Sequence, residues 1–281
     1  TKNGCDVELI RAPPRSVRAG ADAVKVDIEN SEIMKAIDAT RGTTRREMFV
    51  LPSQMNGAEY SSPMDHSIVG NVTKGSPNYT SDNTGGPRGQ LACDLDIAQY
   101  ICDHASNSKR PDGINYVRDV IRDIPGIELK NGYLTEMPAF STQDLDLFVE
   151  ARHKMDVLLS RNIAVKGMVP SFPLHSGVRR QPGSLAKAAR VDLVYASAVP
   201  YGTYGNGTSK RWERVCRVAL EQQYYLALAA AARCIQLGKH SSYKIHFMPL
   251  GGGVFGNKLS WIFEALTQAL KDAQATFLTK E

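Results

Sequence analysis

The chain has 281 residues, of which 42% are hydrophobic, 22% charged and 7% aromatic. This composition excludes an intrinsically disordered chain, and the length excludes a small scaffold that depends on disulfide bonds. The formal charge of +5 comes from 34 basic and 29 acidic residues that are scattered along the sequence, whereas a nucleic-acid-binding protein concentrates its basic residues. We therefore expect a globular protein without a sequence-specific nucleic-acid partner.

Apolar runs and cysteine spacing bound the cellular context. The longest apolar run, 224–232, is closed by Arg233 and falls far short of the roughly 20 residues that a membrane helix needs. The five cysteines form no Cys-x-x-Cys pair and have no histidine at zinc-site spacing, so neither a metal nor a cofactor is expected. Reduced thiols indicate a soluble intracellular protein of the cytoplasm or nucleus. Because the chain begins with Thr1, a preceding segment remains open.

The first half of the chain predicts few regular elements and one long loop. A strand over 23–28 and a helix over 31–39 are expected before a buried strand at 48–51, which Pro52 ends. Residues 52–88 are rich in Ser, Asn, Gly, Pro and Thr without a periodic pattern, which predicts a functional loop. Apolar residues at helical spacing then predict a helix over 90–105.

Local signals are sharper in the second half. Asn131-Gly132 predicts a hairpin over 127–137, and Ser141 with Asp144 predicts a capping box that opens a helix reaching Leu159. The remaining elements are strands over 163–169 and 191–199 around a basic loop, a helix over 210–237, a strand over 245–248 and a helix from 258. This alternation predicts an α/β fold with a mixed central sheet flanked by helices.

No linker or internal repeat divides the sequence, so we expect a single domain. Its core is expected over 46–275, with residues 1–45 as an N-terminal extension and the long loop as an insertion after the first core strand.

The sharpest motif is Pro-Leu-Gly-Gly-Gly-Val-Phe-Gly-Asn at 249–257, between a strand and a helix. Glycines let backbone N–H groups approach an anion, and the start of the helix adds partial positive charge. Asn257 is a natural N-cap. The spacing also matches the dinucleotide-binding pattern, but that fold needs a second strand and an acidic residue about 20 positions later, and only one helix remains. A phosphate-binding loop and a tight turn without a ligand both stay open.

A second motif lies at the two ends of the long loop. Residues 54–60 follow the buried strand, and residues 82–90 lead into the next helix, together offering amides, carboxylates and a Gly-Gly turn. Amides and carboxylates suit ribose hydroxyls, and a carboxylate can deprotonate a water. The alternative is a surface loop without a ligand. Because both motifs follow strands, they are expected at the same edge of the sheet, where ligands bind in such folds.

In this order of elements the sequence resembles the macrodomain superfamily, in particular the poly(ADP-ribose) glycohydrolase-like branch and its divergent MavL-like ADP-ribosyl hydrolases. Residues 51–56 and 85–90 resemble the family's Asn-containing and first glycine loops, and 251–256 is similar to its second phosphate loop. The usual Asn-Ala-Ala-Asn and the Glu pair after the first glycine loop are absent. The resemblance implies a macrodomain-like fold and ADP-ribose, free or attached to a protein, as the partner.

The resemblance implies an ADP-ribosyl hydrolase as the leading hypothesis. Its transition state resembles an oxocarbenium ion, so a carboxylate is needed near the distal ribose. Glu59 and Asp82 are expected to be catalytic, with Gln90 orienting the water, and Asp94 is the next carboxylate to test. The ligand-binding residues expected are Gln54, Asn56, Thr84, Gly85, Gly86, Gly251, Gly252, Gly253, Val254, Phe255, Gly256 and Asn257. The missing Glu pair favours an alternative, a module that binds ADP-ribose or a nucleotide without cleaving it. A nucleotide-sugar or NAD-binding protein of another kind is the third hypothesis.

Overall fold

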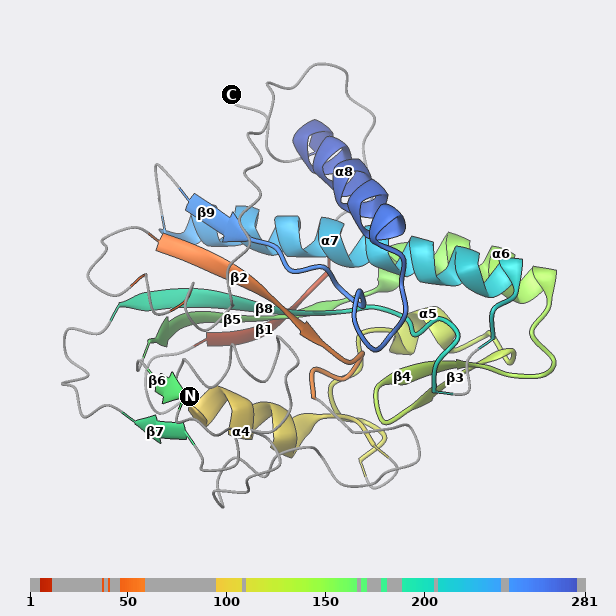
Figure 1. Ribbon diagram of the computed structural model, residues 1–281, viewed down its shortest axis with the longest axis horizontal. Coiled ribbons are helices and arrows are strands. Elements are labelled where there is room, and N and C mark those ends of the chain that lie inside the picture. The colour runs from red at the N-terminus through yellow and green to blue at the C-terminus, as the bar shows by residue number, and fades with distance from the viewer. Residues whose placement is uncertain are drawn as a thin grey trace.

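A computed structural model describes residues 6–11, 37, 40, 46–58, 95–107, 110–165, 168–170, 178–180, 189–204, 207–238 and 243–276. A five-stranded sheet with the order β1–β5–β8–β2–β9 forms its centre (Figure 1). The predicted strand over 23–28 lies outside the described residues, as does nearly all of the predicted helix over 31–39.

The sheet is mixed. Its parallel part consists of β8 (Arg190–Ser197), β2 (Arg46–Ser53) and β9 (Tyr243–His246), with β2 between the other two. β5 (Val157–Ala164) is antiparallel to β8, and β1 (Asp6–Ile10) is antiparallel to β5. β1 therefore points in the same direction as the three parallel strands. The predicted α/β class with a mixed sheet is confirmed.

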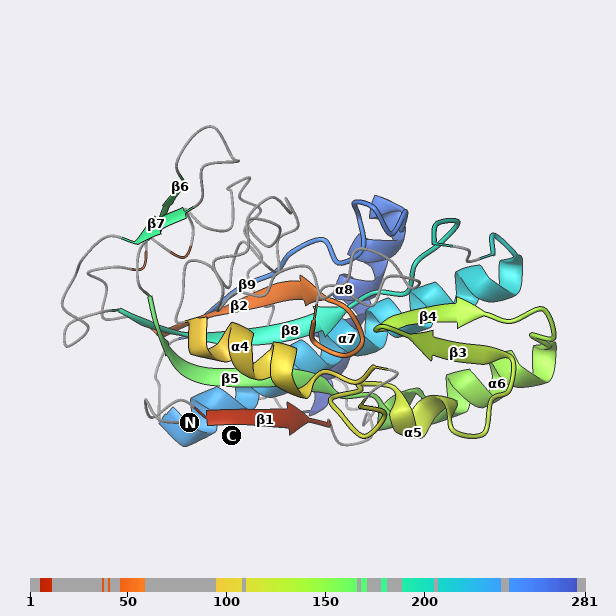
Figure 2. The ribbon, with the colours of Figure 1, turned by 90° about the horizontal axis from the view of Figure 1, so that it is seen from below.

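Helices cover both faces of the sheet (Figures 1 and 2). α7 (Lys210–Gly238) lies against one face and α8 (Leu259–Thr276) packs on the outer side of α7, whereas α4 (Leu95–His104) lies on the opposite face. α7 is buried on most sides because it lies between the sheet and α8, which explains its Ala-rich second half. No described helix is long and apolar enough to cross a membrane.

Strand β2 shows why the buried strands have continuous apolar runs. Residues 48–51 have no exposed surface, because β2 is paired on both sides and covered on both faces. β8 has the same pattern, with only its first residue exposed. The predicted strands over 48–51 and 191–199 are confirmed by these two elements.

The hairpin and the capping box form as predicted. β3 (Ile127–Lys130) pairs with β4 (Tyr133–Glu136) through a turn in which Asn131 and Gly132 have φ angles of 45° and 81°. α6 (Thr142–Ala151) begins after Ser141, whose hydroxyl accepts the backbone N–H of Asp144 at 3.1 Å. The Asp144 carboxylate accepts the Ser141 backbone N–H at 2.8 Å, which completes the box.

The helix that starts at Ser141 is shorter than predicted. α6 ends at Ala151, a 3-10 turn (η2, Arg152–Lys154) follows, and Leu159 lies in β5 rather than on a helix. A short apolar run such as 157–159 fits a buried strand as well as a buried helix, and pairing with β1 and β8 decides for the strand.

Two other expectations shift, and two elements were not predicted. The basic loop predicted over 170–190 includes β7 (Val178–Arg180), which pairs with β6 (Met168–Pro170). β9 begins and ends two residues before the predicted strand at 245–248, and a four-residue helix, α5 (Arg118–Ile121), was not predicted. β1 was not predicted either, and it adds an edge strand from the segment expected as an extension.

Candidate functional site

The carboxyl ends of β2, β8 and β9 lie at one edge of the sheet because these strands are parallel neighbours. We call it the carboxyl edge. Residues 54–58 follow β2 there, 198–204 follow β8, and 247–257 follow β9. The β3–β4 hairpin lies beyond this edge (Figure 2). Ligands bind at such edges in open α/β sheets, so this arrangement brings two of the predicted segments to a favourable place.

Residues 249–257, which we call the glycine loop, fold as two consecutive turns. The Gly252 N–H donates to the Pro249 carbonyl at 3.1 Å, and the Gly256 N–H donates to the Gly253 carbonyl at 3.0 Å. Gly251 and Gly256 have φ angles of 68° and 70°, in the left-handed region that favours glycine. The fold itself therefore requires glycine at these two positions.

The middle of the glycine loop is open to solvent. Gly252, Gly253 and Val254 are exposed, and a side chain at Gly253 would meet no atom within 4 Å. Within the described part of the chain, no backbone hydrogen bond uses the N–H groups of Gly253, Val254 or Phe255. Consecutive free N–H groups just before a helix form a suitable environment for an anion.

Asn257 anchors the glycine loop to the segment after β8. Its side-chain amide donates to the Val199 carbonyl at 2.9 Å, and its backbone N–H donates to the Gly251 carbonyl at 3.0 Å. The first hydrogen bond of α8 runs from Ile262 to Lys258, so Lys258 holds the N-cap position predicted for Asn257. The Asn257 Oδ1 atom is buried and accepts no hydrogen bond from a described residue, so it remains an acceptor for a ligand or a water.

An aromatic cluster adjoins the glycine loop. The ring centroids of Tyr133 and Tyr204 are 4.8 Å apart, and Phe255 lies 5.6 Å from Tyr133 and 5.9 Å from Tyr204. The rings come from β4, from the segment after β8 and from the glycine loop. Tyr204 and Phe255 keep part of their surface exposed, so the cluster can stack on a flat ring or cover a sugar. Sequence analysis identified only Phe255, because no local pattern links the three segments.

Gln54 and Asn56 lie in a buried turn after β2, and neither side chain has exposed surface. The Asn56 Nδ2 donates to the Ser106 carbonyl at 2.9 Å, and its Oδ1 accepts the Ala58 N–H at 3.2 Å. The amide of Asn56 is thus used on both sides by the backbone. In this structure Asn56 holds the turn together, and because its side chain has no exposed surface, a direct contact with a ligand would require the turn to move.

The hairpin turn connects the segment after β2 with the aromatic cluster. The Met55 N–H donates to the Gly132 carbonyl at 2.9 Å, and Tyr133, the next residue, packs against Phe255. A side chain at Gly132 would collide with Asn56 Oδ1, which explains the glycine. The predicted catalytic residues and the first glycine loop lie outside the described residues; these are Glu59, Asp82, Thr84, Gly85, Gly86 and Gln90.

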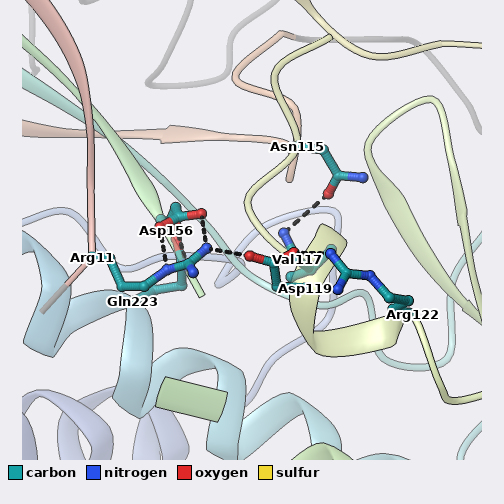
Figure 3. A network of polar contacts seen from close by, with 7 residues as sticks. All are labelled: Arg11, Asn115, Val117, Asp119, Arg122, Asp156 and Gln223. Carbon is teal, nitrogen blue, oxygen red and sulfur yellow. Dashed lines mark hydrogen bonds and ion pairs between the residues drawn. The ribbon is translucent and has the colours of Figure 1, made fainter. Parts of the chain in front are cut away.

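A second polar cluster lies at the β1 end of the same edge (Figure 3). Arg11 donates to both carboxylate oxygens of Asp156, at 2.9 and 2.8 Å, and pairs with Asp119 at 2.9 Å. These hydrogen bonds raise the pKa of Arg11 and lower that of Asp119, whereas burial raises the pKa of Asp156 against the opposing effect of Arg11. Gln223 of α7 donates to the Asp156 carbonyl at 3.0 Å and ties the cluster to the core.

No three His, Cys, Asp or Glu side chains within the described ranges are placed to hold a metal ion. Comparison with known protein families found none that matches the chain, and comparison with curated proteins found no relative.

Proposed function

We propose that the protein binds ADP-ribose at the carboxyl edge and hydrolyses its bond to a protein side chain or to another ADP-ribose. The observation that carries this proposal is the exposed glycine loop with free N–H groups at 253–255, beside the aromatic cluster. A diphosphate needs several convergent donors, and a ribose or a base needs a flat apolar surface next to them. The resemblance to macrodomains supports the same assignment for residues 251–256.

In this proposal the backbone supplies most of the affinity. The N–H groups of Gly253, Val254 and Phe255 donate to the diphosphate, and the positive end of the α8 dipole adds to the attraction. Phe255 and Tyr204 enclose the distal ribose. The free Asn257 Oδ1 accepts a ribose hydroxyl or a bridging water.

The chemistry is assigned to Glu59, Asp82 and Gln90 on sequence grounds. One carboxylate accepts a proton from the attacking water while the other stabilises the positive charge on the ribose. Water adds to the anomeric carbon, the bond from this carbon to the acceptor atom breaks, and the leaving group takes up a proton. Gln90 orients the water. The alternative, binding without cleavage, is favoured by the missing Glu pair after Gly86.

Binding is tested with ADP-ribose against adenosine in a thermal-shift assay. Ligand at 100 times its dissociation constant adds about 2.7 kcal/mol of stability. For a chain of this size that corresponds to a rise in Tm of roughly 5–10 °C. No shift at millimolar ADP-ribose would contradict the proposal, and a shift with other nucleotides alone would favour the third hypothesis.

Gly253→Asp and Gly253→Asn form a matched pair for the glycine loop. Both side chains have the same size and enter open space, so neither disturbs the fold, and only the Asp repels a diphosphate. We expect the Asp variant to bind ADP-ribose more than tenfold more weakly than the wild type, a loss of at least about 1.4 kcal/mol. The Asn variant is expected to lose less. If the Asp variant binds ADP-ribose as tightly as the wild type, the glycine loop does not contact the diphosphate and is only a turn.

Catalysis is tested by the release of ADP-ribose from a modified protein. Glu59→Ala and Asp82→Ala should each lower single-turnover release by about 100-fold, with a much smaller change in affinity. Wild-type rates in both variants would move the chemistry to another carboxylate, with Asp94 next. Tight binding by the wild type without any release would establish the binding module instead.

A further inference from the structure

A pocket of about 570 Å³ lies at the β1 end of the carboxyl edge, away from the glycine loop. Its lining includes Arg11 after β1, Tyr100 and His104 of α4, and the segment 110–119. The pocket lies beside β1, an outer strand of the sheet, whereas the glycine loop packs against the segment after β8, with β5 between these two strands. The volume lies within the range of small-molecule sites.

The walls of this pocket are held rigidly by backbone contacts. The Ile114 N–H donates to the His104 carbonyl at 2.7 Å, and Arg118 donates to the carbonyls of Pro111 and Gly113 at 3.1 and 2.6 Å. A side chain at Gly113 would come within 2.5 Å of the His104 carbonyl, so the segment lies directly on the end of α4. A site with fixed walls loses little entropy when a ligand binds.

The pocket lining holds three arginines, Arg11, Arg110 and Arg118, and three aspartates, Asp112, Asp119 and Asp156. Arg11 and Arg122 are matched by Asp119 and Asp156 in one connected network (Figure 3). The guanidinium of Arg110 has no hydrogen bond or ion pair with any residue that the structure describes.

One further free donor lines the pocket, on Asn115. Arg118 already donates to the Pro111 and Gly113 carbonyls. Its ion pair with Asp112, at 3.6 Å, contributes little because the Asp112 side chain is 98% exposed. The Asn115 Nδ2 makes no hydrogen bond with a described residue, since Asn115 uses its Oδ1. His104 donates from its Nδ1 to the Tyr100 carbonyl, so the Nε2 of the neutral ring is an acceptor rather than a donor. The pocket therefore leaves the Arg110 guanidinium and the Asn115 amide free to donate to a ligand.

One wall of the pocket is aromatic. The rings of Tyr100 and His104 are stacked, with centroids 4.1 Å apart and planes 18° from parallel, and the apolar side chains of Leu9 and Ile114 also line the pocket. Guanidinium groups bind phosphate through two parallel hydrogen bonds, and aromatic rings stack on a flat ligand. We propose that this pocket is a second ligand site, which takes a phosphate monoester attached to a flat ring, such as a nucleoside monophosphate.

Calorimetric titration of the whole chain with adenosine monophosphate, ribose 5-phosphate and inorganic phosphate tests this site. We expect saturable binding of adenosine monophosphate, with ribose 5-phosphate and phosphate weaker because they cannot stack. Arg110→Gln removes the unpaired guanidinium without breaking an internal contact, and it should weaken binding by about tenfold. Arg122→Gln, which removes the same charge from outside the pocket lining, should leave the affinity within twofold of wild type.

Gly253→Asp separates this site from the proposed ADP-ribose site. It should leave the binding of adenosine monophosphate unchanged even where it abolishes the binding of ADP-ribose. If Gly253→Asp binds neither ADP-ribose nor adenosine monophosphate, and Arg110→Gln binds adenosine monophosphate as tightly as the wild type, then the phosphate binds at the glycine loop and the second site is overturned. Absence of binding at millimolar adenosine monophosphate, or equal affinities for the three probes, would also overturn it.

Discussion

The glycine loop gives a quantitative prediction about stability, because its glycines differ in what a side chain would meet. At Gly251 an added Cβ would lie 2.5 Å from the Nδ2 of Asn257 and 2.6 Å from the Cβ of Ala198. At Gly256 it would lie 2.7 Å from the Tyr201 carbonyl, whereas at Gly253 it would meet nothing within 4 Å. Only the first two have positive φ angles.

The expected cost of Gly251→Ala has two parts. A non-glycine residue in the left-handed region costs about 1–2 kcal/mol. Crowding against the fixed Ala198 and Asn257 side chains adds about 1–3 kcal/mol. The free energy of unfolding of Gly251→Ala should therefore fall by roughly 2–5 kcal/mol. Gly256→Ala should lose a similar amount, because its added Cβ would crowd the Tyr201 backbone carbonyl. Gly253→Ala should stay within about 0.5 kcal/mol of wild type.

Urea denaturation, followed by circular dichroism and tryptophan fluorescence, measures these differences. Coincident transitions and an unchanged slope would show that the free energies are comparable. A Gly251→Ala variant as stable as wild type would refute the two-turn geometry of the loop. A Gly253→Ala variant as unstable as Gly251→Ala would refute the open position of Gly253, on which the Gly253→Asp binding test depends.

Two further predictions concern charged groups elsewhere. Asp144→Asn should destabilise the fold by about 1 kcal/mol at pH 7, because it removes the charged half of the α6 capping box. The Ser141 hydroxyl lowers the pKa of Asp144 in the folded protein, so the stability that this carboxylate contributes is present above the unfolded pKa of 3.8 and is lost as the pH falls through the lower folded pKa. If urea titrations give the same difference in unfolding free energy between wild type and Asp144→Asn at pH 7 and at pH 2.5, this explanation is contradicted. Arg11→Met should cost about 1–3 kcal/mol at pH 7, since it leaves the mostly buried Asp156 carboxylate unpaired. Burial raises the pKa of Asp156, so the stability lost in Arg11→Met should shrink as the pH falls toward 4 and this carboxylate becomes protonated. A loss of stability that stays constant between pH 7 and pH 4 would exclude the unpaired carboxylate as its cause.

The elements that sequence analysis predicted well are those with local signals. The Asn131-Gly132 turn and the Ser141 capping box depend on contacts over two or three residues, and both form as expected. The start and end of α7 were also predicted to within one residue, because its helical pattern is long. The strand β5 was placed too late because its first apolar residues, near Leu159, are also compatible with a helix.

The parts of the site that sequence analysis missed depend on distant contacts. Arg11 and Asp156 are separated by 145 positions, and no pattern near either residue indicates a bidentate pair. Tyr133 and Tyr204 come from different elements and meet Phe255 only in the folded chain. Asn56 was expected to face a ribose because it follows a strand, but the carbonyl that occupies its amide belongs to Ser106 of another segment.

In the proposed hydrolase, Asn56 then has a positioning role instead of a direct contact with the ribose. Its Oδ1 accepts the N–H of Ala58, and the Ala58 carbonyl accepts the N–H of Gln54, so the turn that ends at Ala58 is fixed from both sides. The next residue in the chain is Glu59, the first of the proposed catalytic carboxylates. A rigid turn directly before a catalytic residue restricts the directions in which the chain can continue, and small errors in placing such a group are costly for catalysis. An Asn-containing segment after the first core strand can therefore serve an ADP-ribosyl hydrolase without touching the ribose, because it sets the path of the chain that leads to the carboxylate.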